Sequence, residues 1–319
     1  MSNYSQNLMI KVADFYYIQN LTQQEIANRL KISRVKISRI LTNAKKRGII
    51  KVNINYPISN CVQIERKFEK LFGLKEALII FSKNRTKEVL FNEVTRTTAQ
   101  YLLEKIQDED ILGISWGRTL RQMVDYIDSS KKKIEIVQML GNVGSNDVSA
   151  DEIVRKLSAI FNGKHLILPA PAIVDNEKIK KTIMSDTTIA QIFEKMKQIT
   201  VAIVGIGDLS KESAFMTSGY LKESDMDFLR KSSSIGDICG RFFDKNGSVS
   251  DTCFNRRVIG IDLEQLKKIP YVIGVVSGTQ KAMAILGALR SGVLDVLITD
   301  RITALEILSK LDGERNCKN

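Results

Sequence analysis

The 319-residue sequence is poor in the residues that build metal sites, disulfides and common catalytic centres. It has one histidine and four cysteines, and none of the cysteines forms a C-x-x-C pair. We therefore expect no metal, no cofactor and no disulfide framework. Histidine-based catalysis would depend on His165, for which we expect a structural role at the start of a buried strand. Carboxylate or lysine chemistry is not excluded by this scarcity.

Long apolar runs are also missing, because no stretch approaches the roughly 18 residues that cross a bilayer. The first residues, MSNYSQNLMIKVADFYY, lack the basic start and cleavage site of a signal peptide. With 44% apolar and 26% charged residues, the composition is that of an ordinary globular protein. We expect a cytoplasmic protein without membrane contact and with room for two domains.

Positive charge is concentrated at one end of the chain. The formal net charge is +12, and the residues through Tyr56 contribute +8 of it, with ten Lys or Arg against two acidic residues. The remaining chain is nearly balanced. A basic segment confined in this way is typical of a surface that binds the phosphates of nucleic acid.

The basic segment predicts one helix, a tight turn and a longer helix. Thr22 followed by Glu25 predicts a capping box at the first helix, and Ser33 predicts the N-cap of the second. Apolar residues from Ile37 to Ala44 recur at i, i+3, i+4 and i+7, so one face of the second helix is buried. Its opposite face carries Arg34, Val35, Lys36, Ser38 and Arg39, as in a helix-turn-helix recognition helix. A solvated helix pair without a nucleic-acid role is the alternative.

We predict a winged-type helix-turn-helix domain over residues 1–57. A helix over residues 6–20 would cover the pair, and the alternating run at 49–56 predicts a strand that Pro57 ends. The residues predicted to contact base edges or phosphates are Gln23, Ser33, Arg34, Lys36, Ser38, Arg39, Lys45, Lys46 and Arg47.

From residue 58 to residue 319, short apolar runs alternate with helical stretches. A helix is expected at 61–72, where Gly73 ends it. The runs that predict buried parallel strands are 77–81, 111–115, 134–140, 165–168, 201–204, 272–276 and 296–299. This alternation predicts a Rossmann-like α/β domain.

Ligands of such sheets bind beyond the carboxyl ends of the strands. Several of these ends are rich in glycine and small hydroxyl residues, which let backbone N–H groups approach an anion. Tight turns also need glycine for steric reasons, so the prediction rests on several such ends in one sheet. The segments are 115–119, 140–144, 204–208, 276–281 and 299–300.

Two cations and one carboxylate favour a polar ligand. Lys281 is expected in the first turn of a helix, where a cation costs roughly 0.3–1 kcal/mol unless an anion binds there. Arg118 repeats this arrangement, with Thr119 as a hydroxyl donor, and Asp237 could accept hydrogen bonds from sugar hydroxyls. The alternatives are a plain surface lysine and a structural ion pair between Asp237 and Arg241.

In their order along the chain, these segments resemble the SorC-type bacterial transcriptional regulators. The resemblance covers nearly the whole chain and is carried by LTQQEIANRLKISRVKISRIL, GISWGRTL, VAIVGIGDL, GDICGRFFDKNG and IPYVIGVVSGTQKAMAILGALRSGVLDVLITD. It implies a helix-turn-helix domain joined to an effector domain related in fold to sugar-phosphate isomerases and glucosamine-6-phosphate deaminase. It also implies a phosphorylated sugar as ligand and a homodimer or homotetramer.

The resemblance places Gly117, Thr119, Gly207, Asp208, Asp237, Ser277, Gly278 and Lys281 in the effector pocket, and the strand-end pattern adds Arg118 and Gly141. The deaminases follow their glycine loop with a Gly-His pair, which this chain replaces by Leu209-Ser210. This difference argues for binding without turnover. Some relatives bind an aldehyde effector through a lysine near the end of the third strand, but residues 138–142 contain none.

We therefore predict a DNA-binding regulator of a carbohydrate-utilisation operon whose affinity for double-stranded operator DNA is controlled by a phosphorylated sugar. One alternative is a sugar-phosphate isomerase- or deaminase-like enzyme with an appended DNA-binding domain. It would use Asp208 or Asp237 as base and Lys281 for phosphate. An architectural protein with a vestigial pocket is a third possibility.

Overall fold

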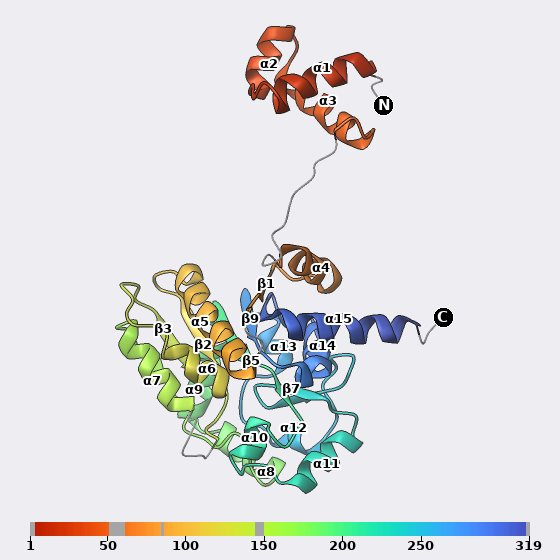
Figure 1. Ribbon diagram of the computed structural model, residues 1–319. Coiled ribbons are helices and arrows are strands. Elements are labelled where there is room, and N and C mark those ends of the chain that lie inside the picture. The colour runs from red at the N-terminus through yellow and green to blue at the C-terminus, as the bar shows by residue number, and fades with distance from the viewer. Residues whose placement is uncertain (1–3, 51–60, 84–85, 144–149, 317–319) are drawn as a thin grey trace. The chain divides into compact units, whose positions relative to one another are not determined.

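A computed structural model describes residues 4–50, 61–83, 86–143 and 150–316. The chain divides into two compact units, Met1–Pro57 and Ile58–Asn319 (Figure 1). Most of the strand predicted at 49–56 lies outside the described residues. No helix of the described part is long and apolar enough to cross a membrane.

The first unit contains α1 (Gln6–Tyr17), α2 (Gln23–Leu30) and α3 (Arg34–Lys46). The predicted capping box is confirmed, because the Thr22 N–H donates to Glu25 Oε2 at 2.7 Å and the Glu25 N–H donates to Thr22 Oγ1 at 3.3 Å. Ser33 caps α3 by accepting from the Lys36 N–H. Lys31, in the left-handed region with φ of 51°, ends α2 and starts the tight turn.

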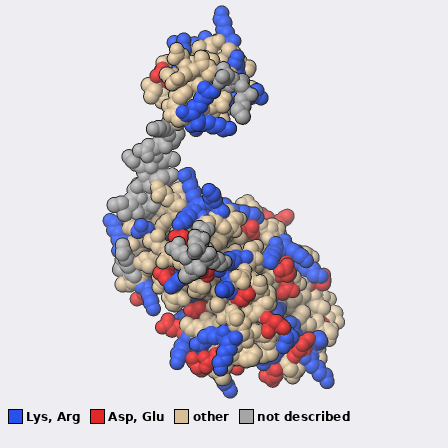
Figure 2. Space-filling view, turned by 90° about the vertical axis from the view of Figure 1, so that its right-hand side faces the viewer, with Lys and Arg blue, Asp and Glu red and all other residues tan. Residues whose placement is uncertain are grey.

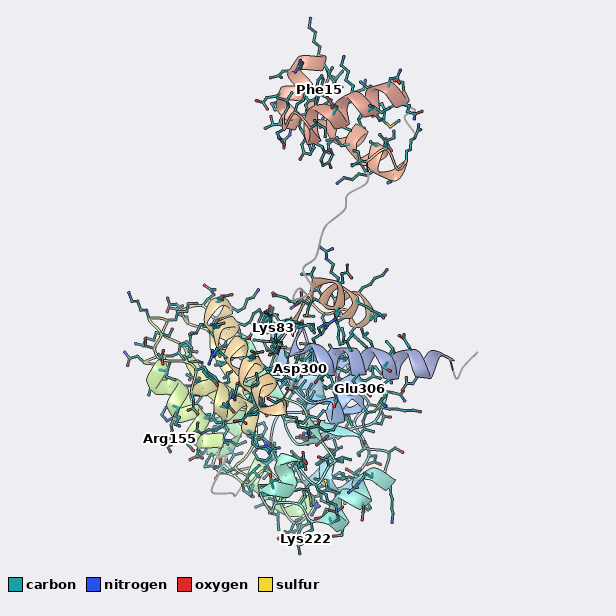
Figure 3. The ribbon with its side chains drawn as sticks, in the orientation of Figure 1. Phe15, Lys83, Arg155, Lys222, Asp300 and Glu306 are labelled. Atoms are coloured by element: carbon teal, nitrogen blue, oxygen red, sulfur yellow. The ribbon has the colours of Figure 1, made fainter. Side chains whose placement is uncertain are left out.

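One small core holds the three helices together. It consists of Met9, Val12, Phe15, Ile26, Ala27, Ile37, Ile40, Leu41 and Ala44. Phe15 lies at its edge (Figure 3), where the Arg29 guanidinium carbon is 4.6 Å from the ring centroid. The apolar pattern predicted for α3 is therefore confirmed as its buried face.

In the second unit, seven described strands form one parallel sheet in the order β1-β10-β9-β5-β2-β3-β4. Each predicted apolar run contributes one strand. Their bounds are β1 Glu76–Ile80, β2 Ile111–Ile114, β3 Glu135–Gln138, β4 His165–Leu166, β5 Val201–Gly205, β9 Tyr271–Val275 and β10 Val296–Asp300. The predicted α/β fold is confirmed.

Helices cover both faces of this sheet (Figure 1). One face packs against α5 (Lys87–Lys105), α6 (Arg118–Val124) and α7 (Ala150–Ile160). The other packs against α9 (Thr187–Met196), α13 (Leu263–Leu266), α14 (Ala282–Arg290) and α15 (Arg301–Asn316). The remaining helices are α4 (Val62–Phe72), α8 (Glu177–Met184), α10 (Ala214–Thr217), α11 (Glu223–Lys231) and α12 (Cys253–Arg257).

A small antiparallel sheet lies beyond the end of β5 and was not predicted. It consists of β6 (Gly207–Asp208), β7 (Gly236–Ile238) and β8 (Arg241–Phe243). These strands have only two or three residues, which is too short for an apolar alternation to be recognisable. They nevertheless carry Asp237 into the interior.

The expectation of a buried strand at His165 is wrong. β4 is a two-residue strand at the edge of the sheet, and His165 is exposed there. Its Nδ1 lies 2.9 Å from the hydroxyl of Ser158 on α7. The apolar run reads as buried because it continues into Leu168, which packs inside after the strand has ended.

The opposite edge of the sheet is covered by α4. Phe68 is fully buried on its apolar side, while Glu65 and Glu69 reach the outer edge of β1. Glu65 Oε1 accepts from the Ile79 N–H at 3.0 Å, and Glu69 Oε1 accepts from the Ala77 N–H at 3.2 Å. These bonds satisfy backbone donors that an exposed edge strand would leave open.

We predict that Glu65→Ala lowers the free energy of unfolding by about 1–2 kcal/mol, because the Ile79 N–H loses its acceptor. Glu65→Gln keeps an acceptor and removes the charge of the carboxylate. The pKa of that carboxyl is raised by burial and by the nearby charges of Glu69 and Glu76. It should therefore be at least as stable as the wild type at pH 7. Denaturant unfolding of the two variants measures this difference, and an alanine variant as stable as the glutamine variant would contradict it.

Candidate effector cavity and nucleic-acid interface

The outward face of α3 is basic and open to solvent. Arg34, Lys36, Ser38, Arg39, Lys45, Lys46 and Arg47 are all exposed, and Figure 2 shows Lys and Arg side chains over this unit with little acidic surface. Ser33 is exposed but its hydroxyl is engaged as the cap, and Gln23 is half-buried at the start of α2. The predicted DNA-contacting residues thus lie on α3 and at the adjoining helix start.

A cavity of about 390 Å³ lies at the carboxyl ends of β2, β5, β9 and β10 in the second unit. It is the place where the sequence predicted a ligand. The predicted residues that line it are Gly117, Arg118, Thr119, Gly207, Asp237, Ser277, Gly278 and Lys281. Their role as ligand contacts remains a prediction.

Gly141 does not line this cavity, so the structure does not bring it together with the other predicted residues. Its N–H donates to the Ile259 carbonyl at 3.0 Å, and a Cβ on it would lie 2.6 Å from the carbonyl oxygens of Ala170 and Pro171. The glycine is needed for this close packing of backbone. It follows β3, which lies outside the contiguous group β10-β9-β5-β2 whose carboxyl ends meet at the cavity.

Asp208 lies beside the cavity without lining it. Its carboxylate is buried on β6 and accepts a hydrogen bond from the Ser210 hydroxyl at 2.9 Å. Side chains alternate along a strand, so Gly207 faces the cavity and the next residue does not. Asp208 acts on the cavity through its charge, which favours the protonated form of Lys281.

Asp237 is a buried carboxylate of the cavity, with 6% of its surface exposed. Its Oδ2 accepts from the Gly240 N–H at 3.0 Å. A Cβ on Gly207, its partner across β6 and β7, would lie 2.0 Å from Asp237 Oδ1, so any larger residue there would displace the Asp237 carboxylate. Burial raises the pKa of Asp237 to about 6, although the positive charge of Lys281 acts in the opposite direction.

Arg241 makes three hydrogen bonds away from Asp237. Its guanidinium is buried and donates to the carbonyls of Asn255, Gly260 and Ile261 at 2.9, 2.6 and 3.1 Å. The predicted alternative of an ion pair between Asp237 and Arg241 is therefore not what the structure shows. Asp237 remains available to a ligand.

Lys281 reaches the cavity from the turn that precedes α14. It is the last residue of a 3₁₀ turn, Thr279–Lys281, and so lies just before the helix in whose first turn it was expected. Its Nζ donates to the Ile206 carbonyl at 3.1 Å. Burial lowers the pKa of Lys281, while the charges of Asp208 and Asp237 oppose that shift.

Asp300 organises the wall beside Lys281 and was not among the predicted residues. It is 1% exposed and accepts from the Ser277 hydroxyl at 2.8 Å and from the N–H and hydroxyl of Thr303 at 2.8 and 2.6 Å. The Gly278 N–H donates to the same Thr303 hydroxyl at 2.9 Å. The Ser277 hydroxyl and the Gly278 N–H are thus already bonded within the wall. The sequence showed a strand end at residues 299–300 but did not indicate that Asp300 makes these bonds.

The opposite wall is formed by the starts of α5 and α6. Arg118 donates to the Glu212 carbonyl at 2.7 Å, and Trp116 packs edge-on against Phe215 with ring centroids 4.9 Å apart. Lys87 and Phe91 of α5 also line the cavity. Sequence reasoning missed Lys87, Phe91 and Phe215 because they follow no strand end.

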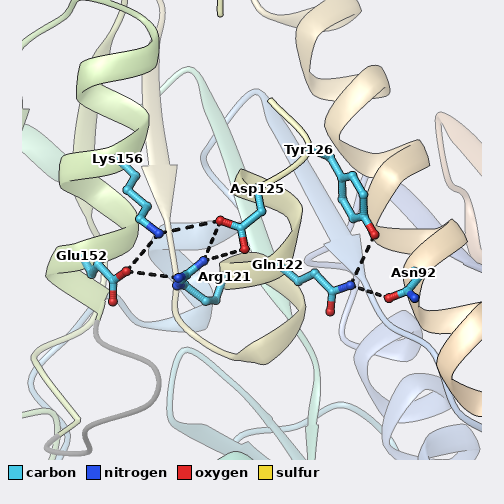
Figure 4. A network of polar contacts seen from close by, with 7 residues as sticks. All are labelled: Asn92, Arg121, Gln122, Asp125, Tyr126, Glu152 and Lys156. Carbon is cyan, nitrogen blue, oxygen red and sulfur yellow. Dashed lines mark hydrogen bonds and ion pairs between the residues drawn. The ribbon is translucent and has the colours of Figure 1, made fainter. Parts of the chain in front are cut away.

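Polar contacts hold α6 against its two neighbours (Figure 4). Gln122 donates to Asn92 on α5, and Arg121 is bonded to Asp125 at 2.8 Å and to Glu152 on α7 at 3.2 Å. Lys156 of α7 completes the group by pairing with Glu152 at 3.1 Å. The segment that presents Arg118 and Thr119 to the cavity is therefore fixed from both sides.

The chain matches two families along its length. The family described as "Putative sugar-binding domain" matches residues 56–309, and the Crp-like helix-turn-helix domain matches residues 12–62. These matches define a DNA-binding transcriptional regulator that carries a sugar-binding domain.

Relatives of the whole chain are of the same kind. The deoxyribonucleoside regulator of Bacillus subtilis is 32% identical over 98% of this chain and all of its own. The crystal structure of the full-length sorbitol operon regulator SorC of Klebsiella pneumoniae has 30% identity and a TM-score of 0.74 over 95% of this chain and 98% of its own. The structure of a transcriptional regulator from Streptococcus pneumoniae has 28% identity and a TM-score of 0.75 over 80% of this chain and 98% of its own. The chain belongs to the family of SorC-type transcriptional regulators.

We predict that the stability of Asp237→Asn relative to the wild type is higher at pH 7.5 than at pH 4.5. The carboxyl of Asp237 has a pKa of about 6 against an ordinary value of 3.8, so its favourable protonated form is lost as pH rises through 6. The wild type then loses on the order of 1–3 kcal/mol that the uncharged variant keeps.

Denaturant unfolding at the two pH values measures the change, with the exposed Asp227→Asn as the control for the same chemical substitution. An Asp237→Asn variant whose stability relative to the wild type is equal at both pH values would contradict the assignment.

Proposed function

We propose that the cavity binds a phosphorylated sugar and that this ligand changes the affinity of the protein for operator DNA. The observation that supports this most is that the cations Arg118 and Lys281 and the buried carboxylate of Asp237 line a single cavity of about 390 Å³. Cations suit a phosphate group, and a carboxylate is an acceptor for sugar hydroxyls. A neutral sugar would bring no anionic group to either cation.

The polar groups of the cavity support a ligand with one anionic and one hydroxyl-rich part. Thr119 and Thr279 add hydroxyls near these two cations, and the glycine turn at Gly117 keeps the backbone accessible. Trp116 and Phe215 provide an apolar surface on which a sugar ring can pack. A volume of about 390 Å³ suits a small ligand of this kind.

We propose binding without turnover. The chain continues from Gly207-Asp208 into Leu209-Ser210 and lacks the histidine of the deaminase loop, and the one histidine of the sequence, His165, lies at β4 outside the cavity lining. Asp237 keeps the enzyme alternative open to experiment, because a carboxyl with a pKa of about 6 suits proton transfer near neutral pH. Product formation from a sugar phosphate would favour that alternative.

Pairing of recognition helices gives the regulator its specificity in this proposal. One recognition helix contacts only a few base pairs, and two helices set a turn of DNA apart read a longer site. A homodimer or homotetramer supplies the two copies. A ligand that binds one arrangement of the pair better than another shifts the population towards it.

We predict that Lys281→Met weakens sugar-phosphate binding by about 10- to 100-fold, because it removes a charge-assisted hydrogen bond. Thermal shift is measured with pentose 5-phosphates and hexose 6-phosphates, each beside its free sugar and inorganic phosphate. Lys267→Met, which removes an exposed lysine paired with Glu264, is the matched control.

Both variants should bind DNA as the wild type does in the absence of ligand. Undiminished stabilisation of the Lys281→Met variant would contradict the phosphate assignment. Stabilisation of the wild type by free sugars as strong as by their phosphates would contradict the proposed ligand class.

A further inference from the structure

Val35 is the most exposed large apolar side chain of α3, with 62% of its surface open to solvent. It is the second residue of the helix, and Ser38, Arg39 and Thr42 follow it at i+3, i+4 and i+7. At about 100° per residue, this stripe lies roughly opposite the face that Ile37, Ile40, Leu41 and Ala44 bury. Val35 therefore stands near the middle of the outward face.

Exposure alone does not assign a function, because single apolar residues are common on protein surfaces. The position of Val35 on α3 and the chemistry of its neighbours give further grounds for a function. The first turns of a recognition helix are the part that reaches base edges. Around Val35 the face is basic and polar, and the Thr42 hydroxyl is turned back onto the Ser38 carbonyl at 3.0 Å. Ser38 and Arg39 supply polar contacts, and Val35 is the apolar group of the stripe.

The major groove offers one apolar group on its base edges, the C5-methyl of thymine. A β-branched valine suits such a contact because its side chain is already restricted at χ1 and loses little freedom on binding. Lys or Arg at this place would instead favour guanine or phosphate.

We propose that Val35 contacts the C5-methyl group of a thymine in the major groove and thereby specifies that base. The proposal rests on DNA binding by α3 and is independent of the ligand class. A contact of Val35 with another protein is the competing explanation, and it predicts no dependence on the thymine methyl.

The test begins with selection of binding sites from a random duplex library by the full-length wild type and by Val35→Ala, Val35→Thr and Ile18→Ala variants. Ile18 is 73% exposed at the end of α1 and serves as the control for loss of an exposed apolar side chain. The preference for thymine at one position of the selected site should fall about three- to tenfold in Val35→Ala. It should fall less in Val35→Thr, which keeps one methyl group, and not at all in Ile18→Ala.

Replacement of that thymine by uracil in the selected duplex then removes only the methyl group. It should weaken the wild type by a similar factor and the Val35→Ala variant by less than about twofold. Equal sensitivity of both proteins to uracil, or an unchanged thymine preference in Val35→Ala, would overturn the proposal. A wild type that selects no sequence would contradict both this proposal and recognition of an operator.

Discussion

Parallel pairing of the strands is the constraint on which the cavity depends. In a parallel sheet every strand delivers its carboxyl end to the same edge, so residues far apart in the chain meet there. Ser115, Gly205, Ser277 and Asp300 come from four different strand ends and line one cavity. The apolar runs that make the sheet thus also determine where polar side chains collect.

Much of this arrangement follows from the sequence. Seven apolar runs predict the seven strands, and the caps at Thr22 and Ser33 predict α2 and α3 to within a residue. Such features are local, because a cap or an alternating run needs no knowledge of distant residues. Most of the predicted cavity residues lie on strand ends, and the same local reasoning placed them there.

The errors and omissions come from contacts that a sequence does not display. Gly141 follows a strand as Gly117 does, but β3 lies outside the group of neighbouring strands whose ends line the cavity, and the glycine packs against the backbone of Ala170 and Pro171. Phe91 and Phe215 belong to helices that approach from the side, and the short strands β6 and β7 have no readable period. Asp300 was not named as a cavity residue because its three hydrogen bonds to Ser277 and Thr303 depend on the packing of the start of α15 beside the turn that follows β9.

The charged residues of the two units differ in burial. α3 presents exposed basic residues, whereas the cavity sets Lys281 against the buried Asp237. In our proposal these two groups contact the anionic and the hydroxyl-bearing parts of a sugar phosphate. Regulation requires a coupling free energy between ligand binding in the cavity and DNA binding by α3. Such coupling is reciprocal, so each ligand changes the affinity for the other by the same factor.

The most direct measurement is the ligand affinity of the full-length protein with and without its selected DNA, beside its DNA affinity with and without the same sugar phosphate. Both affinities should change by the same factor, and this factor should be about 5- to 150-fold. DNA affinity that is unchanged by a saturating ligand would contradict the account.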